Sequence, residues 1–324
     1  MSKNISYKDA AEFFRTHDNY YILIHQNPDG DAVGSGFGLC FALRLLGKKA
    51  NVMCSDPIPE KYSYILKDYE PQKFNHKTTV STDLPDVKLL GKGLSGYSDF
   101  IELALDHHKS NTGFADLTVQ DPAASSACEV LYEILSEGEI PISKETALCI
   151  YTGIATDTGC FKYECTTPRC HIIAAKLIEQ YMLPIGRINR ILFDIKSTEK
   201  MKFEQKVISE MQVLLDGKCA VITINHSDME KCGVTEQDTE GVASLPMQVQ
   251  GIEVGVTLRE KEENRYKVSM RSAEIVDCSE ICRRFGGGGH TRAAGCIIEG
   301  DADQVRMKIL AAVAPILGID LWLA

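Results

Sequence analysis

One histidine and two aspartates lie within seven residues of each other in the segment HQNPDGDAVGSG, at 25–36. The apolar run before it predicts a strand that ends at His25, and the Pro-Asp-Gly turn then brings Asp29 and Asp31 to the start of a helix. An imidazole beside two carboxylates suits Mn²⁺ or another divalent first-row ion. The alternative is an acidic turn in which Asp31 only caps the following helix.

A second group of this kind follows another apolar strand, in the segment LALDHHKSN at 103–111. A single histidine is usually an ordinary core or surface residue, but Asp106, His107 and His108 are consecutive at the end of a strand. Because side chains alternate along a strand, we expect one histidine to face a metal ion and the other to face the substrate.

A third carboxylate, Asp157, lies in the segment TGIATDTG at 152–159, where a largely apolar helix ends. Taken alone, an aspartate in a polar turn after a helix is commonplace. Together with the two segments above, it adds a further oxygen ligand.

The segment FGGGGHTRAAG, at 285–295, suggests contact with an anion. Consecutive glycines in front of a helix let backbone N–H groups approach a phosphate, and the helix dipole adds to the attraction. The glycines expected to do this are Gly287, Gly288 and Gly289. His290 and Arg292 would then bind a phosphate or stack on a base. The alternative is a flexible glycine linker.

The elements that must position these residues divide the chain into two parts. Up to about residue 190, short apolar runs alternate with helical stretches, which predicts an α/β fold with a mostly parallel sheet flanked by helices. Such sheets place their chemistry beyond the carboxyl ends of the strands. The apolar spacing over 197–218 predicts a single amphipathic helix, and the strands and final helix after it predict a smaller α/β domain. We therefore expect a catalytic domain at 1–190, a linker helix at 191–217 and a substrate-binding domain at 218–324.

Composition limits the class of partner. The 324 residues include 35 Lys and Arg against 45 Asp and Glu, so the formal net charge is −10. This balance argues against a broad basic face that coats long nucleic acid, although a small anionic substrate bound at one site remains compatible with it. No apolar run approaches the ~20 residues that span a bilayer, and no signal sequence begins the chain, so we expect a cytoplasmic protein without a membrane partner. Twelve scattered cysteines with no C-x-x-C pair are expected to be buried thiols.

Gly34, Gly36 and Gly38 also allow the interpretation that the chain binds a dinucleotide, since Asp56 follows about 20 residues later. That fingerprint requires its glycines directly after the strand, whereas nine residues intervene here. We therefore expect these glycines to serve close helix packing. A non-enzymatic nucleotide sensor is a further class, and it would tolerate the loss of a metal ligand.

Taken together, the four segments resemble the DHH family of phosphoesterases with its DHH-associated C-terminal domain. The shared elements are H-x-N-P-D-G-D-A-x-G-S, D-H-H-x-S-N, T-D-T-G and G-G-G-H, in the family's order and spread over nearly the whole chain. The resemblance implies that the metal ligands are His25, Asp29, Asp31, His107 and Asp157. It also places His108 beside the scissile phosphate, with Asp106 orienting an imidazole.

The family requires one more aspartate, and the segment TTVSTDLPDVKLLG at 78–91 is the only one that fits. Asp83 is therefore the candidate ligand, with Asp86 as the substitute. The segment departs from the family pattern because its strand is polar and Lys88 stands where an arginine is usual.

The resemblance further implies catalysis by two divalent ions, with Mn²⁺ expected and Mg²⁺ or Co²⁺ as alternatives. Asp83 and Asp157 would bridge the ions, which clamp the attacking and leaving oxygens of an in-line displacement. His108 would act as general acid. Arg271 and the 287–292 segment would bind the far phosphate or base of the substrate.

The implied substrates are short RNA or DNA oligonucleotides, cut to mononucleotides, and 3′-phosphoadenosine 5′-phosphate (pAp), converted to AMP. Short two-domain members of the family act as oligoribonuclease and as 3′,5′-bisphosphate nucleotidase. A soluble hydrolase of cyclic di-AMP or linear pApA and a RecJ-like single-strand exonuclease are the alternatives. The resemblance is also consistent with a homodimer.

Overall fold

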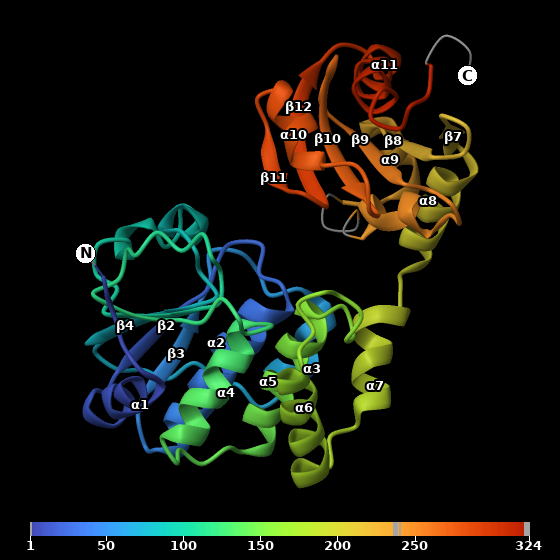
Figure 1. The fold of residues 1–324 in the computed structure, drawn as a ribbon. Coiled ribbons are helices and arrows are strands. Elements are labelled where there is room, and N and C mark those ends of the chain that lie inside the picture. Colours follow the sequence, from blue (N-terminus) through green and yellow to red (C-terminus); the bar gives the residue numbers. More distant parts are fainter. Residues whose placement is uncertain (1, 236–238, 240, 321–324) are drawn as a thin grey trace. The chain divides into compact units, whose positions relative to one another are not determined.

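The computed structural model describes residues 2–235, 239 and 241–320. The chain forms two compact units, Met1–Ile195 and Lys196–Ala324 (Figure 1). Within the described residues, none of the helices has the length and apolar character that a bilayer crossing requires. All twelve cysteines are free thiols, and most of them are buried, as expected.

The first unit is built on a six-stranded sheet in the order β1-β6-β5-β4-β2-β3. Every neighbouring pair in it is parallel, so the predicted α/β class with a parallel sheet is confirmed. The strands are β1 (Lys3–Asn4), β2 (Tyr20–Leu23), β3 (Ala50–Met53), β4 (Thr78–Thr82), β5 (Leu103–Asp106) and β6 (Leu117–Gln120). Because the strands run in one direction, the residues that follow β2, β4 and β5 emerge at the same edge of the sheet.

Helices cover this sheet and bury its apolar residues (Figure 1). They are α1 (Tyr7–Thr16), α2 (Gly30–Leu45), α3 (Ser63–Leu66), α4 (Ala127–Glu137), α5 (Lys144–Asp157), α6 (Pro168–Tyr181) and α7 (Ile185–Asn189). Short helical turns lie at Glu60–Tyr62, Val87–Leu90, Ser95–Tyr97 and Arg190–Asp194. Helices α2 and α5 matter most for the site, because Asp31 lies at the start of one and Asp157 at the end of the other.

Glycines allow α2 and α5 to approach each other closely. A Cβ at Gly34 would lie 2.5 Å from the carbonyl oxygen of Cys149, and one at Gly153 would lie 2.6 Å from Asp31 Oδ1. A Cβ at Gly38 would lie 3.2 Å from Cys149 Cβ. The expectation that the glycines of α2 serve helix packing is therefore confirmed.

The second unit contains a six-stranded mixed sheet in the order β11-β12-β10-β9-β8-β7. Its strands are β7 (Gln212–Leu214), β8 (Cys219–Ile224), β9 (Val254–Glu262), β10 (Arg265–Ser272), β11 (Gly288–His290) and β12 (Ala293–Glu299). Its helical segments are α8 (Thr198–Ser209), α9 (His226–Cys232), η6 (Val242–Gln248), α10 (Cys278–Arg284) and α11 (Ala302–Val313). Only β8 and β9 pair in parallel among the neighbours in this sheet.

The single helix predicted over 197–218 is wrong in its second half. Helix α8 ends at Ser209, and residues 212–214 form β7, which pairs with β8. The apolar residues Leu214 and Leu215 pack on the sheet of the second unit instead of continuing a helical stripe. The turn that follows uses positive φ at Leu215, Asp216 and Gly217, which a helix cannot contain. Phe203 and Val207 of α8 also pack against β8, so α8 belongs to the second unit.

The close packing of α2 on α5 predicts a large effect of a single methyl group. Gly34→Ala should lower the free energy of unfolding by about 1–3 kcal/mol, because the new Cβ meets backbone that cannot rotate away. Urea unfolding measures this change. Gly186→Ala, in α7, is the matched control, since nothing lies within 4 Å of its Cβ and the substitution should be neutral or slightly stabilising. Equal effects of the two substitutions would contradict the packing argument.

Candidate metal centre

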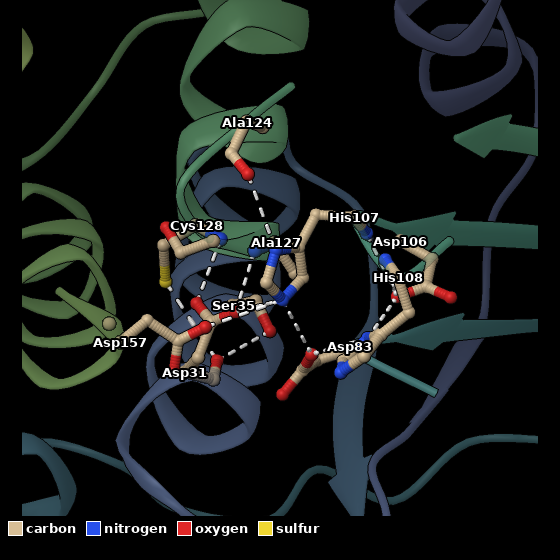
Figure 2. Close-up of polar contacts among 12 residues, drawn as sticks. Asp31, Ser35, Asp83, Asp106, His107, His108, Ala124, Ala127, Cys128 and Asp157 are labelled. Atoms are coloured by element: carbon tan, nitrogen blue, oxygen red, sulfur yellow. Dashed lines mark hydrogen bonds and ion pairs between the residues drawn. The ribbon is translucent and has the colours of Figure 1, made fainter. Parts of the chain in front are cut away.

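Side chains from the ends of three strands and from two helices of the first unit meet at the carboxyl edge of its sheet (Figure 2). His25 and Asp29 follow β2, Asp83 follows β4, and His107 follows β5. Helices α2 and α5 add the two remaining carboxylates, Asp31 and Asp157. Every metal ligand expected from the sequence therefore lies in one cluster.

The first donor group is formed by His25, Asp29 and Asp83. His25 Nε2 lies 3.8 Å from Asp29 Oδ1 and 3.6 Å from Asp83 Oδ2. The other ring nitrogen, Nδ1, donates to the carbonyl oxygen of Gln26 at 2.8 Å. This contact fixes the ring, so that Nε2 faces the two carboxylates.

The second donor group is formed by Asp31, His107 and Asp157 (Figure 2). His107 Nε2 lies 3.3 Å from Asp157 Oδ2 and 3.8 Å from Asp31 Oδ2. Its Nδ1 donates to the carbonyl oxygen of Ala124 at 3.4 Å. Again the backbone orients the ring, and Nε2 faces the carboxylates.

Asp83 belongs to the first group, and it also forms a third donor group with His107 and His108. Its Oδ2 faces His25, whereas its Oδ1 lies 3.7 Å from His107 Nε2 and 3.6 Å from His108 Nδ1. The backbone of Asp83 has φ of 54°, a left-handed conformation that aspartate tolerates better than most residues. Its N–H donates to the carbonyl oxygen of Leu105 at 2.9 Å, which ties the end of β4 to β5.

These donor atoms are buried without the partners they would normally have. Among the residues that the structure describes, Asp83 Oδ1 and His107 Nε2 have no hydrogen-bond partner, although buried polar groups are almost always paired. Separations of 3.3–3.8 Å are too long for strong hydrogen bonds, but they suit neighbouring ligands of one ion. The residues present therefore fit a divalent cation.

The electrostatics of the cluster point the same way. Burial raises the pKa of Asp83 well above its ordinary value, and the nearby carboxylate of Asp31 raises it further. The pKa of Asp157 is also well above its ordinary value, mainly because of burial and further because of the carboxylates of Asp31 and Asp83. Burial also raises the pKa of Asp31, although His107 opposes this rise. Ionised carboxylates so close together need added positive charge.

His25 and Asp29 show the opposite response. Burial opposes protonation of His25, but the carboxylates of Asp29 and Asp83 outweigh burial and raise its pKa to about 11. Burial would raise the pKa of Asp29, but His25 and the backbone N–H groups of Ala32 and Asp31 lower it. A proton on His25 thus provides positive charge at this position, and a metal ion would take its place.

Asp106 holds His108 rather than contributing to a donor group. Its Oδ1 accepts from His108 Nδ1 at 2.8 Å, and its Oδ2 accepts from Asn111 Nδ2 at 2.5 Å. Burial would raise the pKa of Asp106, but these two hydrogen bonds lower it. Burial would lower the pKa of His108, but Asp106 raises it. The His108 side chain is 38% exposed against 16% for His107, so it is the histidine that can reach a ligand from solvent.

The strand geometry expected at the two histidines is wrong, whereas the division of their roles between metal and substrate stays a prediction. Strand β5 ends at Asp106, so the alternation of strand side chains does not extend to His107 and His108. Their ring centroids are 4.5 Å apart, and both rings approach Asp83.

The structure also contains a support that the sequence analysis did not identify. Asp31 Oδ2 accepts from the backbone N–H of Ala127 at 2.6 Å, and Oδ1 accepts from that of Cys128 at 2.9 Å (Figure 2). These N–H groups begin helix α4, where a negative charge is stabilised. Ser126 followed three residues later by Glu129 is a helix-start signal that could have pointed to this contact.

Asp86, the substitute for Asp83, takes a local role. Its side chain accepts from the backbone N–H of Lys88 at 2.9 Å and caps the short helical turn at Val87–Leu90. The donor groups found among the described residues contain Asp83 and not Asp86.

The second unit brings part of the predicted substrate-binding set to one open hollow of about 690 Å³. Arg271 and Gly287, Gly288 and Gly289 line it. Lys267 and Ser269 line it too, because alternate residues of β10 share a face of the sheet. In the sequence, Lys267, Ser269 and Arg271 are separated by two positions each, and this spacing on a predicted strand indicates that they share a face.

The basis expected for anion binding at the glycines is wrong. No helix follows them, since residues 293–299 form strand β12, which pairs with β10 and β11. Helix α10 precedes the glycines instead, and Gly286, with φ of 73°, ends it. Cations along β10 are therefore better placed to meet an anion than a helix dipole is.

His290 and Arg292 follow the glycines of this hollow in the sequence. His290 ends β11, and Arg292 comes two residues later. His290 is exposed. Arg292 Nη1 donates to the carbonyl oxygen of Val276 at 3.2 Å. Part of the role of Arg292 is thus to hold the loop that leads into α10.

Comparisons with known proteins agree with this organisation. Residues 19–154 match the DHH family, N-terminal domain, and residues 216–317 match the DHHA1 domain. The bifunctional oligoribonuclease and PAP phosphatase NrnA of Thermus thermophilus is 31% identical over 302 residues, which cover 90% of this chain and 88% of the relative. The protein of the same name from Bacillus subtilis is 27% identical over 306 residues, covering 91% and 96% of the two chains.

A solved structure has a similar fold over nearly the whole chain. The exopolyphosphatase-related protein of Bacteroides fragilis matches with a TM-score of 0.85 and 25% sequence identity, over 96% of this chain and 97% of that one.

The crowding of carboxylates predicts that removing one stabilises the metal-free protein. Asp83→Asn should raise the free energy of unfolding in the presence of a chelator by on the order of 1 kcal/mol or more. A raised pKa means that the folded protein holds the proton more tightly than the unfolded chain, so Asp83 contributes less stability as pH rises. The gain should therefore grow as pH rises above about 4. Urea unfolding across pH measures this.

Asp86→Asn is the matched control, because asparagine can keep the cap at residue 88. Its stability should follow that of the native protein at each pH. Equal curves for the two variants would show that Asp83 is not under electrostatic strain.

Proposed function

The chain belongs to the DHH family of phosphoesterases, and on that premise we propose that it hydrolyses short oligonucleotides to mononucleotides and pAp to AMP. The observation that carries this proposal is the pair of buried, unpartnered ligand atoms, Asp83 Oδ1 and His107 Nε2, within a cluster of carboxylates and imidazoles. The names of the Thermus and Bacillus relatives supply the substrate class. In this proposal residues 1–190 act as the catalytic domain and 218–324 as the substrate-binding domain.

The donor set supports two divalent ions, with Mn²⁺ as the expected metal. Two of the three donor groups offer one imidazole nitrogen and two carboxylate oxygens, a mixture that suits first-row ions. His25, Asp29 and Asp83 would hold one ion, and Asp31, His107 and Asp157 the other. Asp83 would bridge them, because its two oxygens face different groups. Such ions, when bound, activate water and stabilise the charge of an in-line phosphoryl displacement.

His108 and Asp106 supply the proton chemistry in this proposal. Asp106 Oδ1 accepts a hydrogen bond from His108 Nδ1, so Nε2 of the protonated imidazole would be the atom that donates to a substrate oxygen. The hydrogen bond from Asn111 fixes Asp106 in turn. Asp106 is therefore a positioning residue, and His108 is the group that would touch the scissile phosphate.

The substrate is proposed to be short for two reasons. The net charge of −10 gives a long polyanion little to follow. In the second unit, Lys267 and Arg271 line a hollow of about 690 Å³, which is small for a long nucleic acid. Arg271 and the glycines at 287–289 would bind the rest of the nucleotide there, with His290 and Arg292 at the margin.

A hydrolysis panel in Mn²⁺ tests the substrate class. It compares pAp, RNA of two to five nucleotides, a 24-nucleotide RNA, cyclic di-AMP and pyrophosphate. We expect turnover of pAp and of the shortest RNA, and a rate on the 24-mer at least tenfold lower. Equal rates on the 24-mer would indicate a RecJ-like exonuclease, and a preference for cyclic di-AMP would indicate a cyclic dinucleotide hydrolase.

Asp157→Ala tests the metal assignment. The substitution should abolish turnover of a two-nucleotide RNA in Mn²⁺, because it removes the carboxylate nearest to His107 Nε2. Asp68→Ala is the control, since Asp68 is an exposed aspartate of the same unit outside the donor groups. Near-native activity of Asp157→Ala would contradict the assignment.

A further inference from the structure

One short turn contacts two of the proposed ligands. The turn comprises residues 121–128, which follow β6 and include the first two residues of α4. The carbonyl oxygen of Ala124 accepts from His107 Nδ1, and the N–H groups of Ala127 and Cys128 donate to Asp31 (Figure 2). The position of this turn therefore sets the ring of one ligand and the carboxylate of another.

A buried glutamate fixes the turn from behind. Glu129 has no exposed surface, and its Oε2 accepts from Ser125 N at 2.9 Å and from Ser125 Oγ at 2.5 Å. Ser126 caps the same helix by accepting from Glu129 N at 3.1 Å. A carboxylate buried in this way requires a cationic partner.

Arg169, on α6, is that partner, and it reaches both ends of the turn. Its Nε donates to Glu129 Oε1, and its Nη2 donates to Asp121 Oδ2 at 2.7 Å. Asp121 also accepts from the hydroxyl of Tyr7, on α1, at 2.6 Å. The planar guanidinium thus spans the turn from its first residue to the helix that follows it.

The donor group of His25, Asp29 and Asp83 is held by different hydrogen bonds. His25 Nδ1 donates to the carbonyl oxygen of Gln26, and Asp29 Oδ1 accepts from the N–H groups of Asp31 and Ala32 at 3.0 Å each. These contacts belong to the loop after β2 and the start of α2. Displacing the 121–128 turn should therefore affect the two groups unequally.

We propose that Arg169 is a positioning residue for one metal subsite, the one formed by Asp31, His107 and Asp157. Through Glu129 and Asp121 it holds the 121–128 turn, so that Asp31 and His107 meet a cation in the required orientation. This inference rests on the proposed metal-dependent function. Changes to groups that orient metal ligands typically reduce metal affinity about 10–100-fold. Loss of Arg169 should therefore weaken the binding of one of the two ions by that factor.

Titration of metal-free protein with Mn²⁺, followed by calorimetry, tests this. The native chain should bind two ions. Arg169→Ala should bind one with native affinity and the second at least tenfold more weakly. Arg169→Lys keeps a positive charge beside Glu129 but cannot span both carboxylates, so its second site should also weaken, to a smaller degree. This second variant keeps the test decisive if Arg169→Ala does not fold.

Arg44→Ala is the matched control. Arg44 lies in the last turn of α2, and its Nε and Nη2 donate to the carbonyl oxygen of Ala50 at 3.0 and 2.8 Å. Its loss should destabilise the unit, as urea unfolding can show, while both ions bind with native affinity.

Three outcomes would overturn the inference: native affinity at both sites in the Arg169 variants, equal weakening of both sites, or the same weakening in Arg44→Ala. Failure of the native chain to bind any Mn²⁺ would instead overturn the proposed function on which the inference rests.

Discussion

Four aspartate carboxylates lie close together at the carboxyl edge of the sheet in the first unit, and their mutual repulsion is the constraint to which the surrounding structure responds. Two unit charges about 4 Å apart interact by about 4 kcal/mol at an effective dielectric constant near 20. A few such terms equal the whole stability of a typical domain, which is about 5–15 kcal/mol. The upward pKa shifts of Asp31, Asp83 and Asp157 express the same cost. A chain that keeps this cluster must supply positive charge or bind it.

The fold supplies part of that charge through its backbone. Parallel strands deliver His25, Asp83 and His107 to one edge, and close contact at Gly34 and Gly153 brings α2 and α5 near enough to add their carboxylates. The start of α4 donates two N–H groups to Asp31. Asp83 Oδ1 and His107 Nε2 are left without hydrogen-bond partners in the described part of the chain, and these are the atoms that a cation would satisfy. The chemistry of the site thus depends on both the direction of the strands and the close packing of the helices.

The residues of this cluster could be predicted from the sequence because they lie in short, local patterns. The turn at 25–31 and the Asp-His-His run each combine an apolar strand with polar residues at its end, and a parallel sheet then brings such ends together. Strand β4 was harder to recognise, since all five of its residues are buried but four are serine or threonine. Its environment comes from β2 and β5 on either side, and no local pattern contains that information.

The errors have the same origin. The apolar residues at 211–215 fit a helical stripe, but residues 212–214 pair with β8 and therefore form a strand. The alanines after the glycines could begin a helix, but β10 was available to pair with them. The contact of Ala127 and Cys128 with Asp31 joins residues almost a hundred positions apart. Tertiary pairing decided each of these cases, and local propensity did not.

The most direct test is a crystal structure of the protein grown in Mn²⁺, with anomalous scattering used to locate the ions. The account predicts two anomalous peaks about 3.5–4 Å apart. One should lie among His25, Asp29 and Asp83, the other among Asp31, His107 and Asp157, and Asp83 should contact both. Peaks elsewhere, or a cluster that contains no ion at saturating Mn²⁺, would contradict the account.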